Sequence, residues 1–212
     1  MEIVIQAAHD YSVQFSEEED ALLKEIYEYT IAHHPESHMI SGPVQGQFLT
    51  MISQMIRPKK ILEIGTFTGY SSLCLAKGLD TTGELHTIEM READAKLANS
   101  FFKKGTYAQK IKLHLGDAHS ILEELNEEWD LIFVDADKTG YIWYYEKLLP
   151  KLKSGSWLLF DNVLFHGEVL KEKISGKNAI AIHAFNEHVK KDVRVEKVLL
   201  TVRDGLMLMR KK

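Results

Sequence analysis

Between residues 60 and 160, short apolar segments alternate with segments of helical length, and this alternation constrains the fold more than any other feature of the sequence. Short, nearly continuous apolar runs are typical of strands that helices cover on both faces. Such strands alternating with helices predict an α/β fold with a parallel sheet and right-handed crossovers. The expected strands are residues 60–64, 84–89, 111–115, 131–135 and 157–160, and the expected helices are residues 71–79, 91–103, 120–126 and 141–149.

The N-terminal part of the chain departs from this alternation and is expected to be helical up to about residue 56. Ser16 and Glu19 have the spacing of a capping box, so the first helix should begin there and end near His33. Pro43 is a favoured first-turn residue and should begin the second helix. One face of that second helix is expected to carry the apolar residues Phe48, Met51, Ile52 and Met55.

The last part of the chain carries a hairpin signal. Asp204-Gly205 separates two apolar segments, residues 193–201 and 206–210, and this dipeptide favours a tight turn. The sheet should therefore finish with an antiparallel pair of strands. The length of 212 residues fits a single domain over residues 1–212, in which residues 1–56 form a helical N-terminal segment.

Charge and cysteine usage narrow the class of protein. A formal net charge of −5 is unfavourable for non-specific nucleic-acid binding, which relies on Lys and Arg to neutralise phosphates. The single cysteine, Cys74, lies in an apolar helical segment, which indicates a buried, inert thiol and a reducing compartment. Residues 1–10 lack the pattern of a secretory signal, and no apolar run approaches the roughly 20 residues that span a bilayer. We therefore expect a cytoplasmic protein.

The first strand of the alternation leads into a glycine-containing turn. Glu63 is an acidic residue within an apolar strand, and Gly65 and Gly69 follow it. Their G-x-x-x-G spacing differs from the G-x-G-x-x-G of dinucleotide-binding enzymes, in which a helix N-terminus receives a pyrophosphate. A carboxylate at this point suits instead an amino-acid ammonium group and a sulfonium. The alternative is a structural Glu63 that bonds a backbone N–H group or a lysine.

Acidic residues also follow the second and third strands. Glu89 ends the second strand, where a carboxylate can accept hydrogen bonds from both ribose hydroxyls. After the third strand, the Asp117 carboxylate or the Ala118 backbone could meet an adenine edge. Because each of these residues lies at the carboxyl end of a strand, their order along the chain predicts a site for S-adenosylmethionine.

Side chains with oxygen atoms follow the fourth and fifth strands. Asp135, Asp161 and Asn162 should converge at the sheet edge, because neighbouring strands lie about 4.8 Å apart. Three hard oxygen ligands without His or Cys suit Mg²⁺, Mn²⁺ or Ca²⁺ rather than Zn²⁺. The alternative is that these residues cap helices. Lys138, which lies three residues after Asp135, is either a general base beside the metal or a surface lysine.

Five segments together carry a recognisable pattern. They are His38-Met39-Ile40-Ser41-Gly42, Leu62-Glu63-Ile64-Gly65-Thr66-Phe67-Thr68-Gly69-Tyr70-Ser71, Gly116-Asp117-Ala118, Val134-Asp135-Ala136-Asp137-Lys138 and Asp161-Asn162-Val163-Leu164. On these segments the chain resembles the cation-dependent O-methyltransferases, the group of caffeoyl-CoA and catechol O-methyltransferases and their bacterial relatives, from about residue 16 to residue 210. The resemblance implies a Rossmann-like methyltransferase fold with a seven-stranded, mostly parallel sheet.

The resemblance also implies roles for individual residues. Together with Asp117, the implied cofactor-binding set consists of Met39, Ser41, Glu63, Gly65, Thr66, Ser71, Glu89, Ala118, Asp135 and Asp137. The implied metal ligands are Asp135, Asp161 and Asn162, and the catalytic pair is Lys138 and Asp135. Lys138 would take the proton of the attacking hydroxyl. Candidate substrate contacts are Lys138, Phe165, His166 and Tyr141, although Tyr141 could equally serve helix packing.

The expected activity is transfer of a methyl group from S-adenosylmethionine to a small catechol-like phenol whose two oxygens chelate the metal. Alignment of oxygen, methyl carbon and sulfur can contribute about 7–11 kcal/mol. One alternative acceptor is a hydroxylated uridine of tRNA, which some bacterial members methylate. The intact Asp135-Ala136-Asp137-Lys138 segment and the net charge of −5 favour the small phenol.

A second alternative is a non-catalytic module that binds the cofactor, and loss of Lys138 or of a metal ligand would mark it. The resemblance implies a homodimer formed partly by the N-terminal helices, so that residues 1–56 serve as a lid and dimer segment. Three histidines near the end of the first helix, His33, His34 and His38, are expected to be solvated loop residues.

Overall fold

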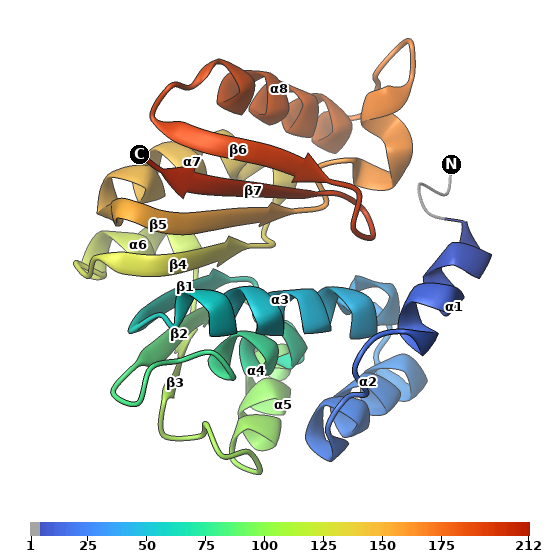
Figure 1. Cartoon of the computed structure of the whole chain (residues 1–212), viewed down its shortest axis with the longest axis vertical. Helices are drawn as coiled ribbons and strands as arrows, with labels where there is room; N and C mark the ends of the chain where they lie inside the picture. Colours follow the sequence, from blue (N-terminus) through green and yellow to red (C-terminus); the bar gives the residue numbers. More distant parts are fainter. Residues whose placement is uncertain (1–4) are drawn as a thin grey trace. The chain divides into compact units, whose positions relative to one another are not determined.

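The computed structural model describes residues 5–212, so the first four residues of the expected N-terminal segment lie outside the described part of the chain. Seven strands form a sheet in the order β3-β2-β1-β4-β5-β7-β6 (Figure 1). Their bounds are β1 Lys60–Ile64, β2 Glu84–Glu89, β3 Ile111–Leu115, β4 Trp129–Val134, β5 Leu152–Asp161, β6 Val195–Leu200 and β7 Leu206–Lys211. β2 is parallel to β1 and β3, β4 is parallel to β5, and β7 is antiparallel to β5 and β6. The predicted mostly parallel sheet with a final antiparallel hairpin is therefore confirmed.

The described residues form two compact units, residues 10–127 and residues 128–212 together with residues 5–9. The helices of the first unit are α2 Ala21–His33, α3 Pro43–Ile56, α4 Tyr70–Ala76, α5 Glu92–Phe102 and α6 Ala118–Glu124, and those of the second are α7 Tyr141–Leu148 and α8 Lys177–Lys191. Helix α1, Gln6–Gln14, runs across the boundary. Short 3-10 helices are η1 Ser37–Met39, η2 Lys138–Gly140, η3 Leu149–Lys151 and η4 Phe165–Leu170. The single-domain organisation stays a prediction.

From residue 5 to residue 212, no helix is both long enough and apolar enough to cross a bilayer.

Helix α3 packs on α4 through small side chains, and the apolar face expected for α3 is only partly buried. Met51 and Met55 are 53% and 78% exposed, whereas Gly46 and Ser53 are buried. A methyl group at Gly46 would come within 2.6 Å of the Tyr70 ring. Ser53 Oγ donates a hydrogen bond of 2.6 Å to a backbone carbonyl of α4. The four apolar residues share one face of α3 at the expected spacing, but the face that packs on α4 is a different one. The sequence did not mark that face, because a close helix–helix approach selects small residues that a hydropathy pattern does not reveal.

Asp20, rather than Ser16, caps helix α2. Asp20 Oδ1 accepts hydrogen bonds from two backbone N–H groups of the first turn, at 3.1 and 2.9 Å. The Ser16 hydroxyl instead donates to the carbonyl oxygen of Ser12, near the end of α1, at 2.7 Å. The capping box expected at Ser16 is therefore wrong, because a preceding helix that the sequence did not suggest uses the serine.

Three aromatic rings fix the start of α7 inside the second unit. The rings of Tyr141 and Phe160 lie 4.9 Å apart, and Phe185 of α8 lies 4.6 Å from Phe160 and 5.4 Å from Tyr141. All three side chains are fully buried. Burial of a large apolar side chain contributes on the order of 1.5–3 kcal/mol, so this cluster holds the first turn of α7 firmly against β5.

Glu84, at the start of β2, joins the three strands of the first unit through two lysines. It pairs with Lys60 of β1 and, at 2.5 Å, with Lys112 of β3. Hydrogen bonds from Lys112 and Lys60 lower the pKa of Glu84 to about 2 from its ordinary value of 4.5. A carboxylate whose folded-state pKa is lowered stabilises the fold above its ordinary pKa. This stabilisation is lost as the pH falls toward the folded-state value.

We predict that Glu84→Gln lowers the free energy of unfolding by about 1 kcal/mol at pH 7, the size expected for a partly exposed ion pair. The difference from the wild type should shrink as the pH falls from 4.5 toward 2. Denaturant titrations at several pH values measure this difference. Glu196→Gln removes a more exposed pair with Arg210 and should change stability little. A difference for Glu84→Gln that is the same at every pH would contradict this account.

Candidate active site

The loop that follows β1 turns across the end of β2. The backbone N–H groups of Gly65 and Thr66 both donate to the carbonyl oxygen of Ile88, at 3.0 and 3.2 Å. Gly65 has a φ of 101°, in the left-handed region that favours glycine. Phe67 has a φ of 50°, which is a strained value for an aromatic residue. This segment, residues 65–69, is called the glycine loop below.

Glu63 lies fully buried near the end of β1, two residues before Gly65. Its Oε2 atom accepts hydrogen bonds from the hydroxyls of Ser72 and, at 2.6 Å, Thr87. The Thr66 hydroxyl lies 2.6 Å from that of Thr87. Hydroxyl donors satisfy part of the carboxylate without neutralising it. Glu63 therefore places a carboxyl group at the start of the glycine loop, and its role in cofactor binding stays a prediction.

Glu89, at the end of β2, is fixed against the glycine loop. Glu89 Oε2 accepts the backbone N–H of Phe67 at 2.8 Å, and Oε1 accepts the backbone N–H of Arg91 at 2.9 Å. Asp117 caps α6 by accepting the backbone N–H of His119 at 3.1 Å, and this hydrogen bond lowers the pKa of Asp117. The structure thus brings Glu89 to the loop, whereas Asp117 has a local helix-capping contact.

The remaining cofactor candidates of the first unit differ in exposure. Thr66, Ser71, Ser41 and Ala118 are buried. Met39, the last residue of η1, is 41% exposed.

In the second unit, the Lys138 ammonium group joins three of the predicted site residues. Lys138 Nζ donates to Asp135 Oδ1 at 2.7 Å, to the Tyr141 hydroxyl at 2.7 Å and to Asn162 Oδ1 at 2.9 Å. Asp161 is fully buried, and its Oδ1 accepts the backbone N–H of Asn162 at 2.7 Å. Three donated hydrogen bonds use all three protons of an ammonium group.

Burial and charge act in opposite directions on Lys138. Burial lowers the pKa of its amine, but the Asp135 carboxylate and, more weakly, that of Asp161 hold the pKa above its ordinary value. Burial also raises the pKa of the Tyr141 phenol, so the hydroxyl keeps its proton and donates it to the Asp161 carbonyl oxygen at 2.8 Å. With only 13% of its side chain exposed, Lys138 is not a solvated surface lysine.

The arrangement around Lys138 fits a divalent cation. Asp135 Oδ1 and Asn162 Oδ1 face one positively charged centre, and Asp161 adds a buried carboxylate next to Asn162. None of the three residues caps a helix, since η2 and η4 follow Asp137 and Leu164. Across residues 5–212, no group of three His, Cys, Asp or Glu side chains could hold a metal. The predicted metal set therefore depends on its amide oxygen.

Asp204 is a residue of this site that the sequence did not reveal. Asn162 Nδ2 donates to Asp204 Oδ2 at 3.4 Å, which leaves Asn162 Oδ1 turned toward Lys138. Asp204 Oδ1 also accepts the backbone N–H of His166 at 2.5 Å. The next residue, Gly205, has a φ of 86°, and a methyl group there would lie 2.5 Å from Leu164 Cγ. The hairpin signal Asp204-Gly205 marked a turn, but only the fold shows which loop it contacts.

The predicted substrate contacts have different surroundings. Tyr141 is fully buried in the aromatic cluster, with its hydroxyl at Lys138. Phe165 and His166 begin η4 with φ values of 46° and 53°, and the His166 side chain is exposed. Asp137 accepts a hydrogen bond from the Tyr144 hydroxyl at 2.8 Å. The acceptor contacts of Tyr141, Phe165 and His166 stay predictions, as does the cofactor contact of Asp137.

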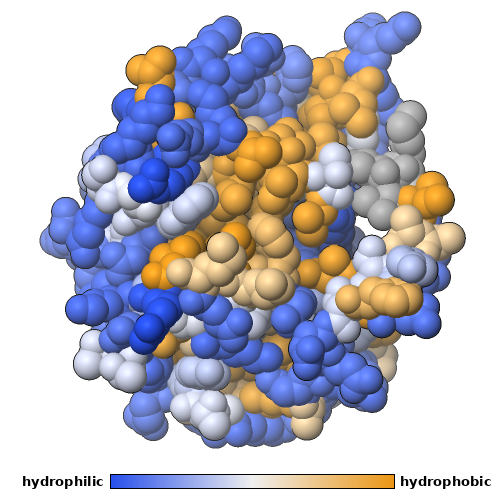
Figure 2. All heavy atoms as spheres, in the orientation of Figure 1, coloured by the Kyte–Doolittle hydropathy of each residue, from blue (hydrophilic) through white to orange (hydrophobic). Residues whose placement is uncertain are grey.

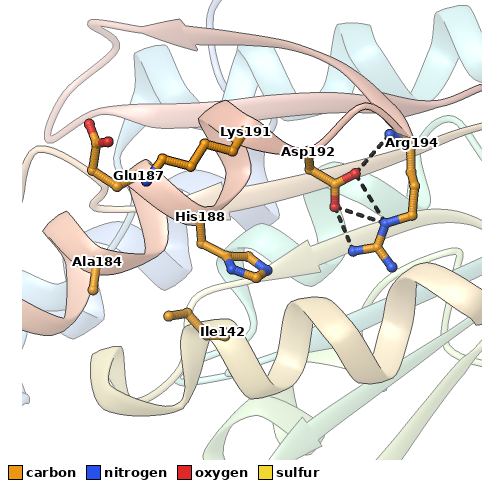
Figure 3. A pocket seen from close by; sticks show the side chains of 7 residues that line it. All are labelled: Ile142, Ala184, Glu187, His188, Lys191, Asp192 and Arg194. Atoms are coloured by element: carbon orange, nitrogen blue, oxygen red, sulfur yellow. Dashed lines mark hydrogen bonds and ion pairs between the residues drawn. The ribbon is translucent and has the colours of Figure 1, made fainter.

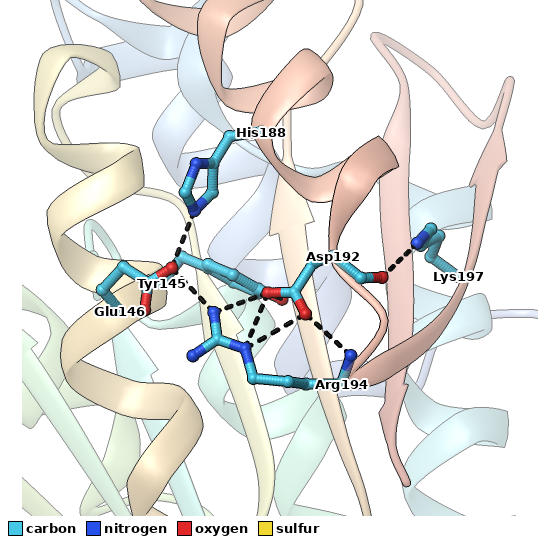
Figure 4. Close-up of polar contacts among 6 residues, drawn as sticks. All are labelled: Tyr145, Glu146, His188, Asp192, Arg194 and Lys197. Atoms are coloured by element: carbon cyan, nitrogen blue, oxygen red, sulfur yellow. Dashed lines mark hydrogen bonds and ion pairs between the residues drawn. The ribbon is translucent and has the colours of Figure 1, made fainter.

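A hollow of about 520 Å³ lies beside α7 and α8 and contains none of the predicted site residues (Figure 3). It is lined by Ile142, Ala184, Glu187, His188, Lys191, Asp192 and Arg194. Three of the lining residues take part in a set of polar contacts (Figure 4): Arg194 Nη2 donates to Glu146 of α7 at 2.7 Å and to Asp192 at 2.5 Å, and His188 bonds the same Glu146 at 2.7 Å. These contacts join the end of α8 to α7 and to the segment before β6, which is a structural role.

Cys74 does not belong to a reactive site. Its side chain is fully buried, and burial raises the pKa of its thiol to about 12. We predict that the native protein reacts with a thiol reagent at pH 8 at least ~100-fold more slowly than the protein unfolded in guanidinium, because the thiolate is the reactive species. Absorbance after addition of Ellman's reagent measures both rates. A rapid stoichiometric reaction of the native protein would contradict the buried position.

Comparisons of the sequence and of the structure with known proteins both match this chain to methyltransferases. An O-methyltransferase family model matches residues 13–212. The probable caffeoyl-CoA O-methyltransferase 2 of Dictyostelium discoideum is 32% identical over 208 residues, which cover 95% of this chain and 90% of that protein. The mouse catechol O-methyltransferase domain-containing protein 1 is 36% identical over 179 residues, which cover 82% and 68%. The SAH-bound methyltransferase of Podospora anserina is 30% identical, with a TM-score of 0.89 and coverage of 99% and 97%. The chain therefore belongs to the O-methyltransferase family and is a methyltransferase enzyme.

Proposed function

We propose that this enzyme transfers a methyl group from S-adenosylmethionine to one hydroxyl of a small catechol-like phenol with the help of a divalent cation, in first place Mg²⁺. The observation that carries the proposal is the Lys138 ammonium group, which lies 2.7 Å from Asp135 Oδ1 and 2.9 Å from Asn162 Oδ1. Oxygens that converge on one cation beside the buried Asp161 carboxylate form a donor set that hard divalent cations prefer.

The donor side of the proposal rests on the first unit. The Podospora anserina relative is SAH-bound, and SAH is what remains when S-adenosylmethionine has given up its methyl group. We assign the methionine part of the donor to Glu63 and the glycine loop, its ribose to Glu89 and its adenine to Ala118. When bound, S-adenosylmethionine supplies a methyl group on a positively charged sulfur.

The acceptor is inferred from the names of two relatives and from the chemistry of the donor set. One relative is named for caffeoyl-CoA and another for catechol. A site with three protein ligands leaves about three positions of an octahedral shell. Two adjacent phenolic oxygens would suit two such positions of a metal held by these residues, so we infer a vicinal diol as the acceptor class.

Lys138 is proposed to accept the proton of the attacking hydroxyl. In the arrangement described, its amine is a cation that donates three hydrogen bonds, so it must first release one proton to solvent. A divalent cation held by Asp135, Asp161 and Asn162 would stabilise a phenolate and, by like-charge repulsion, lower the pKa of Lys138. The Tyr141 hydroxyl, 2.7 Å from Nζ, keeps the amine at the site when its other two contacts are released.

We predict that methyl transfer to caffeate stops in EDTA and returns when Mg²⁺ is added in excess. A phenol with a single hydroxyl should be a poor acceptor because it cannot chelate. Transfer of labelled methyl groups from S-adenosylmethionine measures both effects. Activity that EDTA leaves intact would contradict the role of the metal, and methylation of undermodified tRNA alone would contradict the acceptor class.

Two aspartates of the same strand region provide a matched pair of variants. Asp135→Asn should reduce kcat/KM for the catechol by more than about 100-fold, since even outer-shell partners of a metal site are worth about 10–100-fold. Asp130→Asn changes a carboxylate of β4 that pairs with the exposed Lys153 and should leave activity near the wild-type value. Equal activities of the two variants would contradict the assignment of Asp135.

Substitutions can distinguish a Lys138 that accepts a proton from a Lys138 that contributes only a positive charge. We predict that Lys138→Arg and Lys138→Met both lower kcat by about 10²- to 10⁴-fold, the range for removal of a general base. Arginine keeps the charge beside Asp135 but does not lose its proton in proteins. Near-normal activity of Lys138→Arg would show that charge alone suffices and would reject the base role.

We also propose that two copies of the chain associate through helix α1. No residue of α1 is buried, and Tyr11 and Phe15 stack with ring centroids 4.3 Å apart while remaining 62% and 67% exposed. Apolar side chains are also visible at the surface in Figure 2. Light scattering should show a wild-type dimer and a Tyr11→Ser, Phe15→Ser monomer, with Tyr29→Ser on α2 as an exposed-tyrosine control. A monomeric wild type would contradict the proposal.

A further inference from the structure

Phe67, in the glycine loop, has a backbone conformation that aromatic residues rarely adopt, and three groups hold it there. The His34 ring contacts the Phe67 ring edge-on, with centroids 4.5 Å apart. The Arg91 guanidinium lies 5.4 Å from the centroid of the Phe67 ring. Glu89 accepts the backbone N–H of Phe67 at 2.8 Å. The conformation of the loop therefore depends on side chains from the end of α2, the end of β2 and the start of α5.

His34 is bonded on both nitrogens. His34 Nε2 donates to Asp94 Oδ1 at 3.0 Å, and the two side chains are only 12% and 7% exposed. The backbone N–H of Glu36 donates to His34 Nδ1 at 3.1 Å. Together these bonds require the neutral imidazole with its proton on Nε2. The expectation that His34 is a solvated loop residue is wrong, because Asp94, sixty positions later in the chain, covers it.

Asp94 connects His34 to the proposed ribose-binding carboxylate. Arg91 Nε lies 2.7 Å from Asp94 Oδ2 and 3.6 Å from Glu89 Oε1. Contacts therefore run from His34 through Asp94 and Arg91 to Glu89, and all four residues lie in the first unit. The segment of residues 34–41 begins at His34, which Asp94 holds in place, and it contains Met39 and Ser41, two of the predicted donor contacts.

We propose that His34 is a positioning residue for the methyl donor. Its hydrogen bond to Asp94 holds residues 34–41 and the glycine loop in the arrangement that binds S-adenosylmethionine. The inference rests on the proposed function, because the donor is assigned to these segments. Without the bond, donor binding must also order both segments, which weakens affinity. His34 does not touch the reacting atoms, so the rate at saturating donor should remain.

Two amide substitutions separate the bonds of His34. His34→Gln places an amide nitrogen where it can still donate to Asp94. His34→Asn is shorter, can accept the backbone N–H of Glu36, and loses the bond to Asp94. The difference in donor affinity between the two variants therefore reports the bond to Asp94. The bond to the Glu36 N–H, which only His34→Asn can keep, and the thermal stability of both variants control for a purely local structural effect.

Calorimetric titration with S-adenosylhomocysteine, together with steady-state kinetics on caffeate, tests the inference. His34→Asn should raise the Kd, and the KM for S-adenosylmethionine, about 10-fold, as for one lost hydrogen bond to a charged group. Its kcat and its KM for caffeate should stay within about twofold of wild type, and His34→Gln should restore most of the affinity.

Three results would overturn the inference while leaving the proposed function intact. They are wild-type affinity in His34→Asn, equal loss in both amide variants, and a lowered kcat with an unchanged donor KM. A wild-type enzyme that does not bind S-adenosylhomocysteine would instead reject the proposed function itself.

Discussion

The arrangement of the site in the second unit depends on the hydrogen bonds that the buried ammonium group of Lys138 donates. A cation with so little solvent needs oxygen partners, and it receives them from Asp135, Asn162 and Tyr141. The aromatic cluster fixes Tyr141, and Asp204 orients the Asn162 amide. The ends of β4 and β5, the start of α7 and the β6–β7 hairpin are thus all tied to one positive charge. The same requirement for oxygens makes this place suitable for a divalent cation.

In the first unit, the corresponding contacts hold the strained glycine loop in one conformation. Phe67 has a positive φ, and the cost of such strain is of the order of 1–3 kcal/mol. Glu89 offsets part of it by accepting the Phe67 N–H, and His34 and Arg91 contact the ring. Contacts within the protein therefore hold the backbone of the glycine loop in one conformation, and a loop held in this way loses less entropy on binding.

The strands and the positions of the charged residues at their ends could be predicted from the sequence. Short segments of strand length that alternate with segments of helical length leave few alternatives, and β1, β2 and β3 have the expected bounds. The proximity of Asp135 and Asn162 followed from parallel neighbouring strands, and both bond the Lys138 ammonium group. Their functional roles are a further step that the coordinates do not test.

Contacts between distant segments could not be predicted. The buried face of α3 depends on how closely α4 approaches, and the capping of α2 depends on a helix with no clear sequence signal. Asp204 and His34 act through residues about 40 and 60 positions away, respectively, and no local pattern marks either contact.

The central claim is that the oxygens around Lys138 form a site for a divalent cation. The most direct measurement is anomalous diffraction from crystals soaked with Mn²⁺, S-adenosylhomocysteine and a catechol. The account predicts one strong peak about 2.1 Å from oxygens of Asp135, Asp161 and Asn162, with the Lys138 amine moved away from Asp135. A complex with ordered catechol, no peak at this position and Lys138 still bonded to Asp135 would contradict it.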